Sequence, residues 1–386
     1  MKKLCMLGAL AVASHAAQAV DFKAGDWTVS LGGIVNAYYT HVACSGDAVG
    51  GLALGGNALG CGGESKRTTI GNGLLPNGLV TSATSTQGDY DIKALIGMYN
   101  ATATDSAISA NSGIDVRQAY FTFGNARMGT VKLGRDNGIF GASAIFGDMT
   151  LIGAGAPVQA TQRGRVTLGH IGAGYSYVGY YGQIAYSTPK SLFGGSGIGL
   201  DVALVSPVAD TPIVAAPAYS TKSSPQAQAQ LSYAAGGFKG WLGAKTQKFE
   251  AIAAGARDFT LRAVEAGASY QAGNAGIIAN VQSGKGLGIL SDADQGDVTT
   301  RAYFVQGTYK PAPSLKLGLG YGISRNSENT VGTGGLKSNA NLTLGLYYAL
   351  TPAITLVGEA GQTRSKGFDG GEARMHGGSL GGIIFF

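Results

Sequence analysis

Met375 to Phe386, the stretch MHGGSLGGIIFF, decides which fold this sequence specifies. Because side chains along a β-strand alternate between two faces, Leu380, Ile384 and Phe386 share one face. The last ten residues carry no Asp, Glu, Lys or Arg and finish on two phenylalanines, which suits a strand that faces lipid. A buried edge strand of a soluble β-sandwich is the alternative. The rest of the sequence favours the lipid-facing strand.

The amino-terminal segment has the three regions of a secretory signal peptide. Lys2 and Lys3 precede an apolar run from Leu4 to Ala13, and the small residues of Ala17-Gln18-Ala19 follow. That run is far shorter than the roughly 20 residues that span a bilayer, so a transmembrane anchor is not expected. We predict a signal peptide at residues 1–19 and one domain at residues 20–386.

Composition favours an all-β membrane protein. The chain has 65 glycines, 18 tyrosines and 13 phenylalanines, but only 13% charged residues. A soluble globular domain carries about 25% charged residues. No later segment has the length and apolarity of a membrane-spanning helix, so a membrane-embedded chain must form a closed β-barrel. Lys and Arg are not clustered, and no nucleic-acid partner is expected.

Alternation and turn residues divide the chain into about sixteen strands, among them Tyr90–Asn100 and Ala275–Ser283, with short turns at one end and long loops at the other. In Leu315–Ser324 one face carries large apolar residues and the other carries Lys316, Ser324 and three glycines. A sandwich has the same alternation. The pairing of tight turns with long loops, and aromatic strand ends such as Tyr347-Tyr348, favour a transmembrane antiparallel barrel.

One connection is much longer than a hairpin requires. It runs from Asp136 to about Tyr181 and contains apolar residues such as Ile145 and Leu151. A barrel of about sixteen strands is too wide for its wall side chains to fill, and long connections are usually functional or disordered. We predict that Gly138–Ala160 folds into the lumen and narrows it.

Two runs before this connection resemble a known family. VRQAYFTFG at Val116–Gly124 and MGTVKLGR at Met128–Arg135 look like the strands that precede the constriction loop of the trimeric, 16-stranded general porins of Gram-negative bacteria. Tyr186–Pro189 followed by Leu192–Gly195 resembles their next strand and turn. The resemblance implies a homotrimer in the outer membrane, with passive diffusion of small hydrophilic solutes and ions through each barrel.

The resemblance also implies a constriction where basic wall residues face acids on the loop. Matched to this sequence, the candidates are Lys93, Arg117, Lys132 and Arg135 on the wall, Arg163 and Arg165 on the returning loop, and the acids Asp136 and Asp148. Strict alternation places Arg117 and Arg135 among apolar neighbours, which leaves open a bulge or a role between subunits. Basic lumen residues outnumber acidic ones, so we expect a mild preference for anions.

The final strand resembles the carboxyl-terminal recognition signal of outer-membrane proteins. The residues that carry this resemblance are Ser379, Gly381, Ile384 and Phe386. It implies two partners besides the chain itself and its solutes, namely the barrel-assembly machinery and outer-membrane lipid.

Cys44 and Cys61 are the cysteines that remain after signal removal. An oxidising periplasm favours a disulfide between them across the long glycine-rich loop that we expect from Val42 to about Leu74, with free thiols as the alternative. His41, His170 and His376 lie far apart, and none has a Ser, Cys or carboxylate at a catalytic spacing. The sequence predicts no metal site, no cofactor and no enzymatic activity.

Two other functions remain open at this point. A substrate-specific channel for small organic acids or aromatic compounds requires a binding ladder, that is, a series of binding side chains along the lumen. The candidates for it are Tyr175, Tyr177, Tyr180 and Tyr181. The other is a structural or adhesive barrel with a plugged lumen. An open, a substrate-blocked or a closed conductance distinguishes these possibilities from a general porin.

Overall fold

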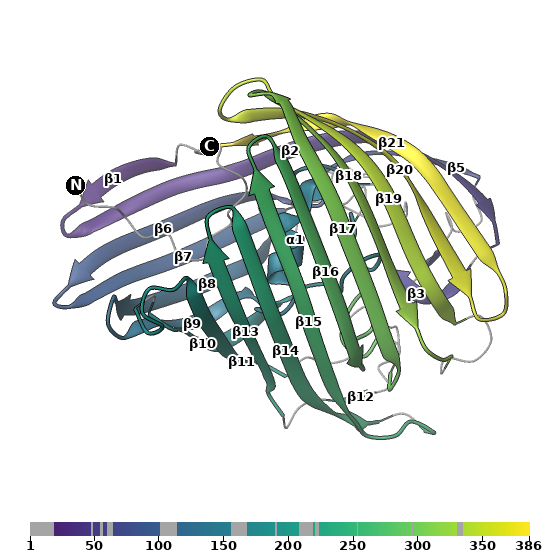
Figure 1. Ribbon diagram of the computed structural model, residues 1–386, viewed down its shortest axis with the longest axis horizontal. Coiled ribbons are helices and arrows are strands. Elements are labelled where there is room, and N and C mark those ends of the chain that lie inside the picture. Colours follow the sequence, from purple (N-terminus) through teal and green to yellow (C-terminus); the bar gives the residue numbers. More distant parts are fainter. Residues whose placement is uncertain are drawn as a thin grey trace.

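The first long strand pairs with the last and closes the sheet. In this computed structural model, β2 (Trp27–Gly46) runs antiparallel to β21 (Glu372–Phe385), from Ile34 opposite Phe385 to Gly46 opposite Ala373 (Figure 1). Within the described residues, the closed antiparallel barrel has sixteen strands including β2 and β21, as predicted. The other fourteen are β6 (Asn77–Gln87), β7 (Tyr90–Asn100), β8 (Asp115–Asn125), β9 (Gly129–Asn137), β10 (Tyr180–Ser187), β11 (Ile198–Val205), β13 (Gln226–Ala235), β14 (Phe238–Ala251), β15 (Phe259–Ala272), β16 (Ala275–Lys285), β17 (Thr299–Ala312), β18 (Leu315–Asn326), β19 (Leu336–Ala349) and β20 (Ile354–Gly367).

The structure describes residues 19–47, 49–54, 57–59, 65–100, 114–155, 168–189, 191–207, 219–220, 224–252, 254–294, 296–329 and 335–386. The predicted signal peptide, apart from Ala19, lies outside them. In these ranges no helix has the length and apolar character needed to cross a membrane.

Two short strands pair with β2, one on each of its edges. β1 (Val20–Ala24) pairs with the start of β2, on the same edge that β21 occupies further along. β5 (Lys66–Gly71) pairs with β2 on the opposite edge, in line with β6. The prediction of a loop from Val42 to Leu74 was therefore wrong at both ends. β3 (Val49–Leu54) pairs with β4 (Asn57–Leu59), and β12 (Tyr219–Ser220) pairs with β14.

The two faces of the wall differ as their alternation predicts. On β19, Leu344 is 58% exposed on the outer face and Asn341 is 1% exposed on the inner face. Short turns gather at one end of the barrel, which we call the turn rim, and long connections such as 286–298 gather at the other, the loop rim. Exposed aromatic side chains encircle the turn rim on the outside, including those of Tyr233, Phe238, Tyr270, Tyr309 and Tyr348. This is the girdle expected of a membrane barrel.

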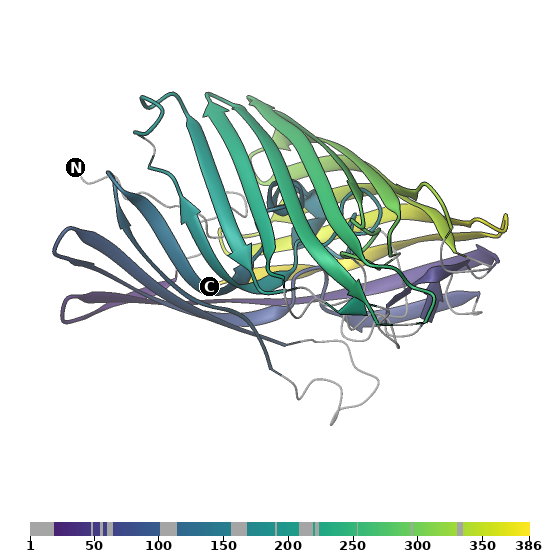
Figure 2. The ribbon, with the colours of Figure 1, turned by 90° about the horizontal axis from the view of Figure 1, so that it is seen from below.

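The described parts of the long connection between β9 and β10, residues 138–155 and 168–179, lie inside the barrel, as predicted for the inserted segment. Residues 156–160 of the predicted segment lie outside the described residues. The connection contains α1 (Ala142–Gly147) and the 3₁₀ turn η2 (Met149–Ile152), which Figure 2 shows within the ring of strands. Its apolar residues form the main buried cluster with inward-facing residues of the wall, such as Trp241 and Ile278.

Candidate functional site

The first half of the inserted loop, residues 138–155, follows the inner wall from β9 toward β2. We call it the outgoing limb. Inward-facing polar side chains of the wall accept hydrogen bonds from its backbone N–H groups. Gln228 on β13 accepts from Ile139 at 2.7 Å, and Glu265 on β15 accepts from Gly141 at 2.9 Å. Gln306 on β17 accepts from Met149 at 2.8 Å, and Glu359 on β20 accepts from Gly155. These acceptors satisfy backbone groups that the irregular limb leaves unpaired.

The second half, residues 168–179, returns along the same wall and is the return limb. Gly174 donates from its backbone N–H to Ser324 Oγ at 3.1 Å, and Ser176 donates to Gln282 Oε1 at 2.9 Å. The amide of Asn339 donates to the carbonyl of Gly172 at 3.0 Å. Both limbs are therefore fixed to the wall formed by β13–β20.

Three glycines on the inner face of β18 allow the limbs to approach this closely. A Cβ at Gly318 would lie 2.2 Å from the sulfur of Met149, and one at Gly322 would lie 2.0 Å from the carbonyl oxygen of Ala173. At Gly320 it would lie 2.8 Å from the ring of His170. The glycine face that the sequence shows in Leu315–Ser324 is thus the surface on which the loop rests. Such a face is a sequence signal of close backbone approach.

Asp148 joins the two limbs. Its carboxylate accepts from the backbone N–H of Thr150 at 2.9 Å and from the hydroxyl of Tyr175 at 2.6 Å, and Nδ1 of His170 lies 2.9 Å away. Burial alone would raise the pKa of Asp148, but His170 and these hydrogen bonds hold that pKa below its ordinary value. Asp148 was predicted to face basic wall residues across the lumen. It does not, because its carboxylate oxygens bind Thr150, His170 and Tyr175 within the loop.

The tip of the outgoing limb reaches the break between β5 and β6. Leu74 lies in this break and donates from its backbone N–H to the carbonyl of Gly153 at 3.0 Å. Asn36 on β2 holds the break in place, because its side chain accepts from Gly73 at 2.8 Å and donates to the carbonyl of Leu75 at 3.1 Å. The Tyr38 hydroxyl donates to the carbonyl of Ile152 at 2.6 Å. Sequence reasoning missed this anchor because it placed the segment in a loop.

The opposite inner wall, formed by β7–β9, carries the predicted basic residues Lys93 and Lys132. Both lie directly opposite Thr122 on β8, so the three side chains lie side by side on β7, β8 and β9 at the same height of the barrel. Lys132 donates to Asp136 at 2.5 Å, and Asp136 also accepts from Gln118 at 2.8 Å. Asp136 thus neutralises a basic wall residue from its own strand rather than facing the wall from the loop. Lys93 has no ion pair with any other described residue.

Arg117 occupies a β-bulge, one of the two arrangements left open by its alternation. The register of β8 against β7 skips this residue, since Gly97 pairs with Gln118 and Met98 pairs with Val116. Its guanidinium donates to Asp115 at 2.6 Å and lies 5.8 Å from the ring centre of Tyr99 and 5.6 Å from that of Tyr180. The bulge therefore turns Arg117 toward tyrosines that line the lumen.

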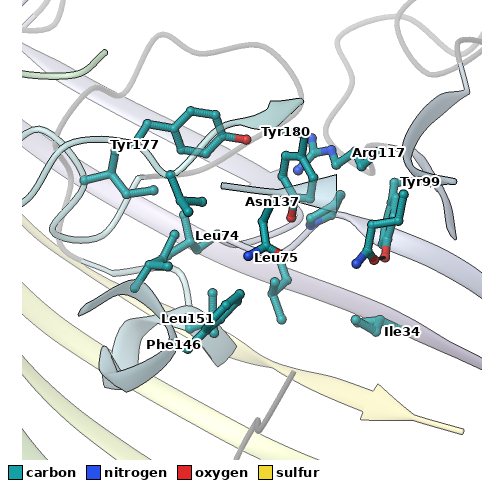
Figure 3. Close-up of a pocket in the computed structure, with 15 residues that line it drawn as sticks. Ile34, Leu74, Leu75, Tyr99, Arg117, Asn137, Phe146, Leu151, Tyr177 and Tyr180 are labelled. Carbon is teal, nitrogen blue, oxygen red and sulfur yellow. Dashed lines mark hydrogen bonds between the residues drawn. The ribbon is translucent and has the colours of Figure 1, made fainter. Parts of the chain in front are cut away.

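A pocket lies between this wall and the loop, and Figure 3 shows Arg117 on one side of it and Leu74, Phe146 and Leu151 on another. Its lining also includes Ile34, Leu75, Pro76, Tyr99, Gln118, Asn137, Ile145, Ile171, Tyr177, Val178 and Tyr180. Apolar side chains thus surround a single guanidinium. Of this set, Arg117, Tyr177 and Tyr180 were predicted as site residues, and Ile145 and Leu151 as apolar residues of the inserted loop. Gln118 lies in the VRQAYFTFG run, but the sequence assigned it no role.

Arg135 does not belong to the constriction. On β9 the inward side chains are those of Lys132 and Asp136, and the intervening Arg135 is exposed on the outer face, beside Ala119 and Gly182. A bulge like that at Arg117 does not occur in the pairing of β9 with either neighbour. Arg163 and Arg165 lie outside the described residues.

The other predicted residues occupy defined positions. Cys44 is disulfide-bonded, and its predicted partner Cys61 lies outside the described residues. Phe386 exchanges backbone hydrogen bonds with Gly33, at 2.7 and 3.1 Å. A Cβ at Gly381 would lie 2.1 Å from the carbonyl oxygen of Ala37, so β21 and β2 require glycine there. In the part of the chain that the structure describes, no group of three His, Cys, Asp or Glu side chains is arranged to hold a metal ion.

Comparison with known sequences decides the family, because the profile of the Gram-negative porins matches residues 5–367. The chain belongs to the Gram-negative porins. Family and fold together place this porin in the outer membrane as a channel protein rather than an enzyme. No curated protein sequence matches it.

Solved structures share the fold of this porin at low sequence identity. The outer membrane channel DcaP of Acinetobacter baumannii superposes with a TM-score of 0.70 at 17% identity, over 95% of this chain and 99% of that one. The anion-selective porin from Comamonas acidovorans gives 0.64 at 18% identity, over 93% and 100% of the two chains. OmpF of Salmonella typhi, in complex with daunomycin, gives 0.62 at 14% identity, over 95% and 100%.

Proposed function

We propose that this porin admits small hydrophilic solutes and ions by passive diffusion, with a mild preference for anions. The observation that carries the proposal is the asymmetry of the lumen. Lys93 on the β7 wall has no ion pair with any other described residue, while the lumen acids Asp148, Glu265 and Glu359 are all buried and accept hydrogen bonds that hold the loop. Uncompensated positive charge beside a water-filled path attracts anions.

A homotrimer is part of the proposal. The support is similarity to a trimer form of OmpT from Vibrio cholerae, with a TM-score of 0.57 at 16% identity, over 93% of this chain and 99% of that one. The Comamonas porin, whose printed description is anion-selective, supports the proposed selectivity in the same way. We further propose signal cleavage after Ala19, pairing of Cys44 with Cys61, and recognition of Ser379, Gly381, Ile384 and Phe386 by the barrel-assembly machinery.

Planar-bilayer recording of the refolded protein under a salt gradient tests the proposal. Three equal conductance steps per insertion, with a reversal potential of the sign expected for anions, are the expected result. A correctly folded barrel without conductance would exclude diffusion and leave the plugged barrel. A cation-favouring potential would exclude the selectivity but retain the channel.

A substrate-specific channel for small organic acids or aromatic compounds is the second candidate, and the pocket of Arg117 favours it. A carboxylate would pair with the guanidinium, and an aromatic or alkyl body would contact Tyr99, Tyr180 and the apolar lining. Tyr175, which was predicted as part of such a ladder, is fully buried against Asp148 and does not contribute.

A further inference from the structure

A second connection folds into the barrel beside the inserted loop. It joins β16 to β17 over residues 286–298, of which residue 295 lies outside the described part, and we call it the second loop. Its apolar side chains Leu287, Ile289 and Leu290 are buried, although they belong to a connection at the loop rim. Connections usually run over the surface of a protein in contact with water. Burial of these side chains therefore indicates that the second loop packs against other parts of the lumen.

One side of the second loop contacts the return limb. The carbonyl of Leu290 accepts a hydrogen bond from the backbone N–H of Tyr177 at 2.7 Å. Ile289 and Leu290 also belong to the main buried cluster, together with Val178 of the return limb. Tyr177 and Val178 line the pocket of Arg117. The second loop therefore supports the segment that forms one side of that pocket.

The other side of the second loop contacts the start of the outgoing limb, and Lys245 lies between them. Lys245, on the inner face of β14, donates to Asp292 of the second loop at 2.5 Å, and the two side chains are 3% and 2% exposed. Its Nζ also lies 4.6 Å from the ring centre of Phe140 in the outgoing limb. Phe140 packs with Leu287 and Ala293 of the second loop. A single buried cation thus contacts both loops.

Two glutamines of β13 connect the same loops by hydrogen bonds. Gln228 accepts from the backbone N–H of Phe140 at 3.1 Å, and its amide donates to Gln226 at 2.5 Å. Gln226 in turn donates to Asp292 at 2.8 Å. Lys245 and the ring of Phe140 close this chain into a ring of contacts, and every member is buried. A buried polar network of this kind rigidifies the groups that it joins.

The backbone of the second loop is held in one conformation. Ala293 has φ of 61°, in the left-handed region that residues other than glycine rarely adopt. Its neighbours on both sides are anchored, Asp292 by Lys245 and Asp294 by the backbone N–H groups of Ile289 and Leu290, at 3.0 and 2.7 Å. Such a conformation persists only where the surrounding contacts determine it.

We propose that the second loop positions the inserted loop by holding both of its ends, Phe140 and Tyr177, and that Lys245 is the positioning residue for this contact. Without the charge of Lys245, the carboxylate of Asp292 would be buried without its cation, which is strongly unfavourable. The second loop would leave the wall, and both ends of the inserted loop would lose their support. The role does not depend on which ion or solute passes through the channel.

Hydrogen exchange of the full refolded protein, followed by mass spectrometry, tests the proposal. K245M and D292N should each accelerate exchange in residues 138–149 and 168–179 at least tenfold, while β18–β20 exchange as in wild type and show that the barrel is folded. K245M/D292N leaves no charge buried and should exchange no faster than either single variant. The matched control is K316M, which removes another inward-facing lysine. Lys316 lies 4.7 Å from the ring centre of Tyr347 but has no ion pair with any described residue, so K316M should exchange as wild type.

A shortened protein tests the second loop without leaving a buried charge. Asn-Gly in place of residues 287–297 joins β16 to β17 through a two-residue turn and exposes Lys245 to water. This protein should also exchange at least tenfold faster in both limbs, and its single-channel current should show additional conductance levels.

Exchange at the wild-type rate in the limbs of both K245M and the shortened protein would overturn the proposal. Acceleration in the shortened protein alone would overturn the role of Lys245, and additive acceleration in K245M/D292N would overturn its pairing with Asp292. Equal acceleration by K316M would overturn the proposal in favour of a general effect of lumen charge. Absence of anion preference in wild type would contradict the proposed function alone, because exchange is measured without ion flow.

Discussion

Nδ1 of His170 lies 2.9 Å from a carboxylate oxygen of Asp148, and both side chains are fully buried between the outgoing and return limbs of the inserted loop. This contact fixes one limb to the other, while wall side chains fix each limb separately. The geometry of the constriction therefore depends on a charge inside the loop.

The contact between Asp148 and His170 should make the channel sensitive to acid. The pKa of Asp148 is held below its ordinary value of 3.8, so its stabilising effect is complete at neutral pH and is lost as pH falls through that lowered pKa. We expect this contact to hold the two limbs together from pH 8 to pH 5, and single-channel conductance to become unstable in stronger acid. D148N should show that instability at pH 7, since breaking a buried pair costs about 3 kcal/mol. The control is D91N, which removes an exposed carboxylate at the turn rim. A D148N channel as quiet as wild type would contradict the prediction.

Replacing Gly322 with alanine should displace the return limb. The new Cβ would lie 2.0 Å from the carbonyl oxygen of Ala173, and overpacking of this kind costs about 1–3 kcal/mol. We expect a lower midpoint of thermal unfolding and an altered single-channel conductance. G307A on the neighbouring strand β17 is the control, because nothing lies within 4 Å of its new Cβ. If G322A and G307A behave alike, the limb does not rest on β18 as described.

Selectivity should depend on Lys93 and on the pair of Lys132 with Asp136. K93Q should lower the anion-to-cation permeability ratio by about two- to fivefold, since a charge a few ångströms from an ion in water contributes about 0.5–1 kcal/mol. K132Q leaves the Asp136 carboxylate unpaired and should lower the ratio further. K132Q/D136N removes both charges and should restore a ratio near that of wild type. Reversal potentials in a salt gradient measure the permeability ratio of each variant. Ratios for K93Q and K132Q identical to that of wild type would contradict the proposed basis of anion preference.

Arg117 should determine whether organic anions block the channel. Benzoate at millimolar concentration should reduce the conductance of wild type, and R117Q should require at least tenfold more, because a hydrogen bond to a charged group contributes about 1.5–3 kcal/mol. Benzyl alcohol keeps the ring without the carboxylate and should not block either protein. Absence of block by benzoate in wild type would remove the second candidate function and leave the general porin.

The partner of Cys44 can be found by substitution. Cys44 is disulfide-bonded, and we expect C61S to expose one thiol that reacts with a maleimide in the denatured, unreduced protein. Wild type that has been exported and purified without reductant should not react. A C61S protein without a reactive thiol would show that Cys44 has another partner.

The sequence by itself determined the barrel. Strand ranges such as Tyr90–Asn100 and Ala275–Lys285 match those expected from alternation and from turn glycines, with differences of a few residues at their ends. Both signals are local, because side-chain period and turn conformation depend on residues a few positions apart. The inward position of the long connection was also predictable, since a wide barrel leaves space and the loop carries apolar anchors.

Only the tertiary structure decided which residues form the site. Gln228 and Glu359 hold the loop from strands far away in sequence, and an inward polar residue that binds a loop has the same alternation as one that faces water. Arg117 reaches the lumen through a bulge that the pattern of β8 alone left open, and Arg135 lacks one and points outward. Asp148 was expected to face the wall, but its environment is set by the return limb, which a motif cannot place. The physical reason in each case is that a side chain's partners come from contacts across the lumen, whereas the pattern of a strand specifies only its face.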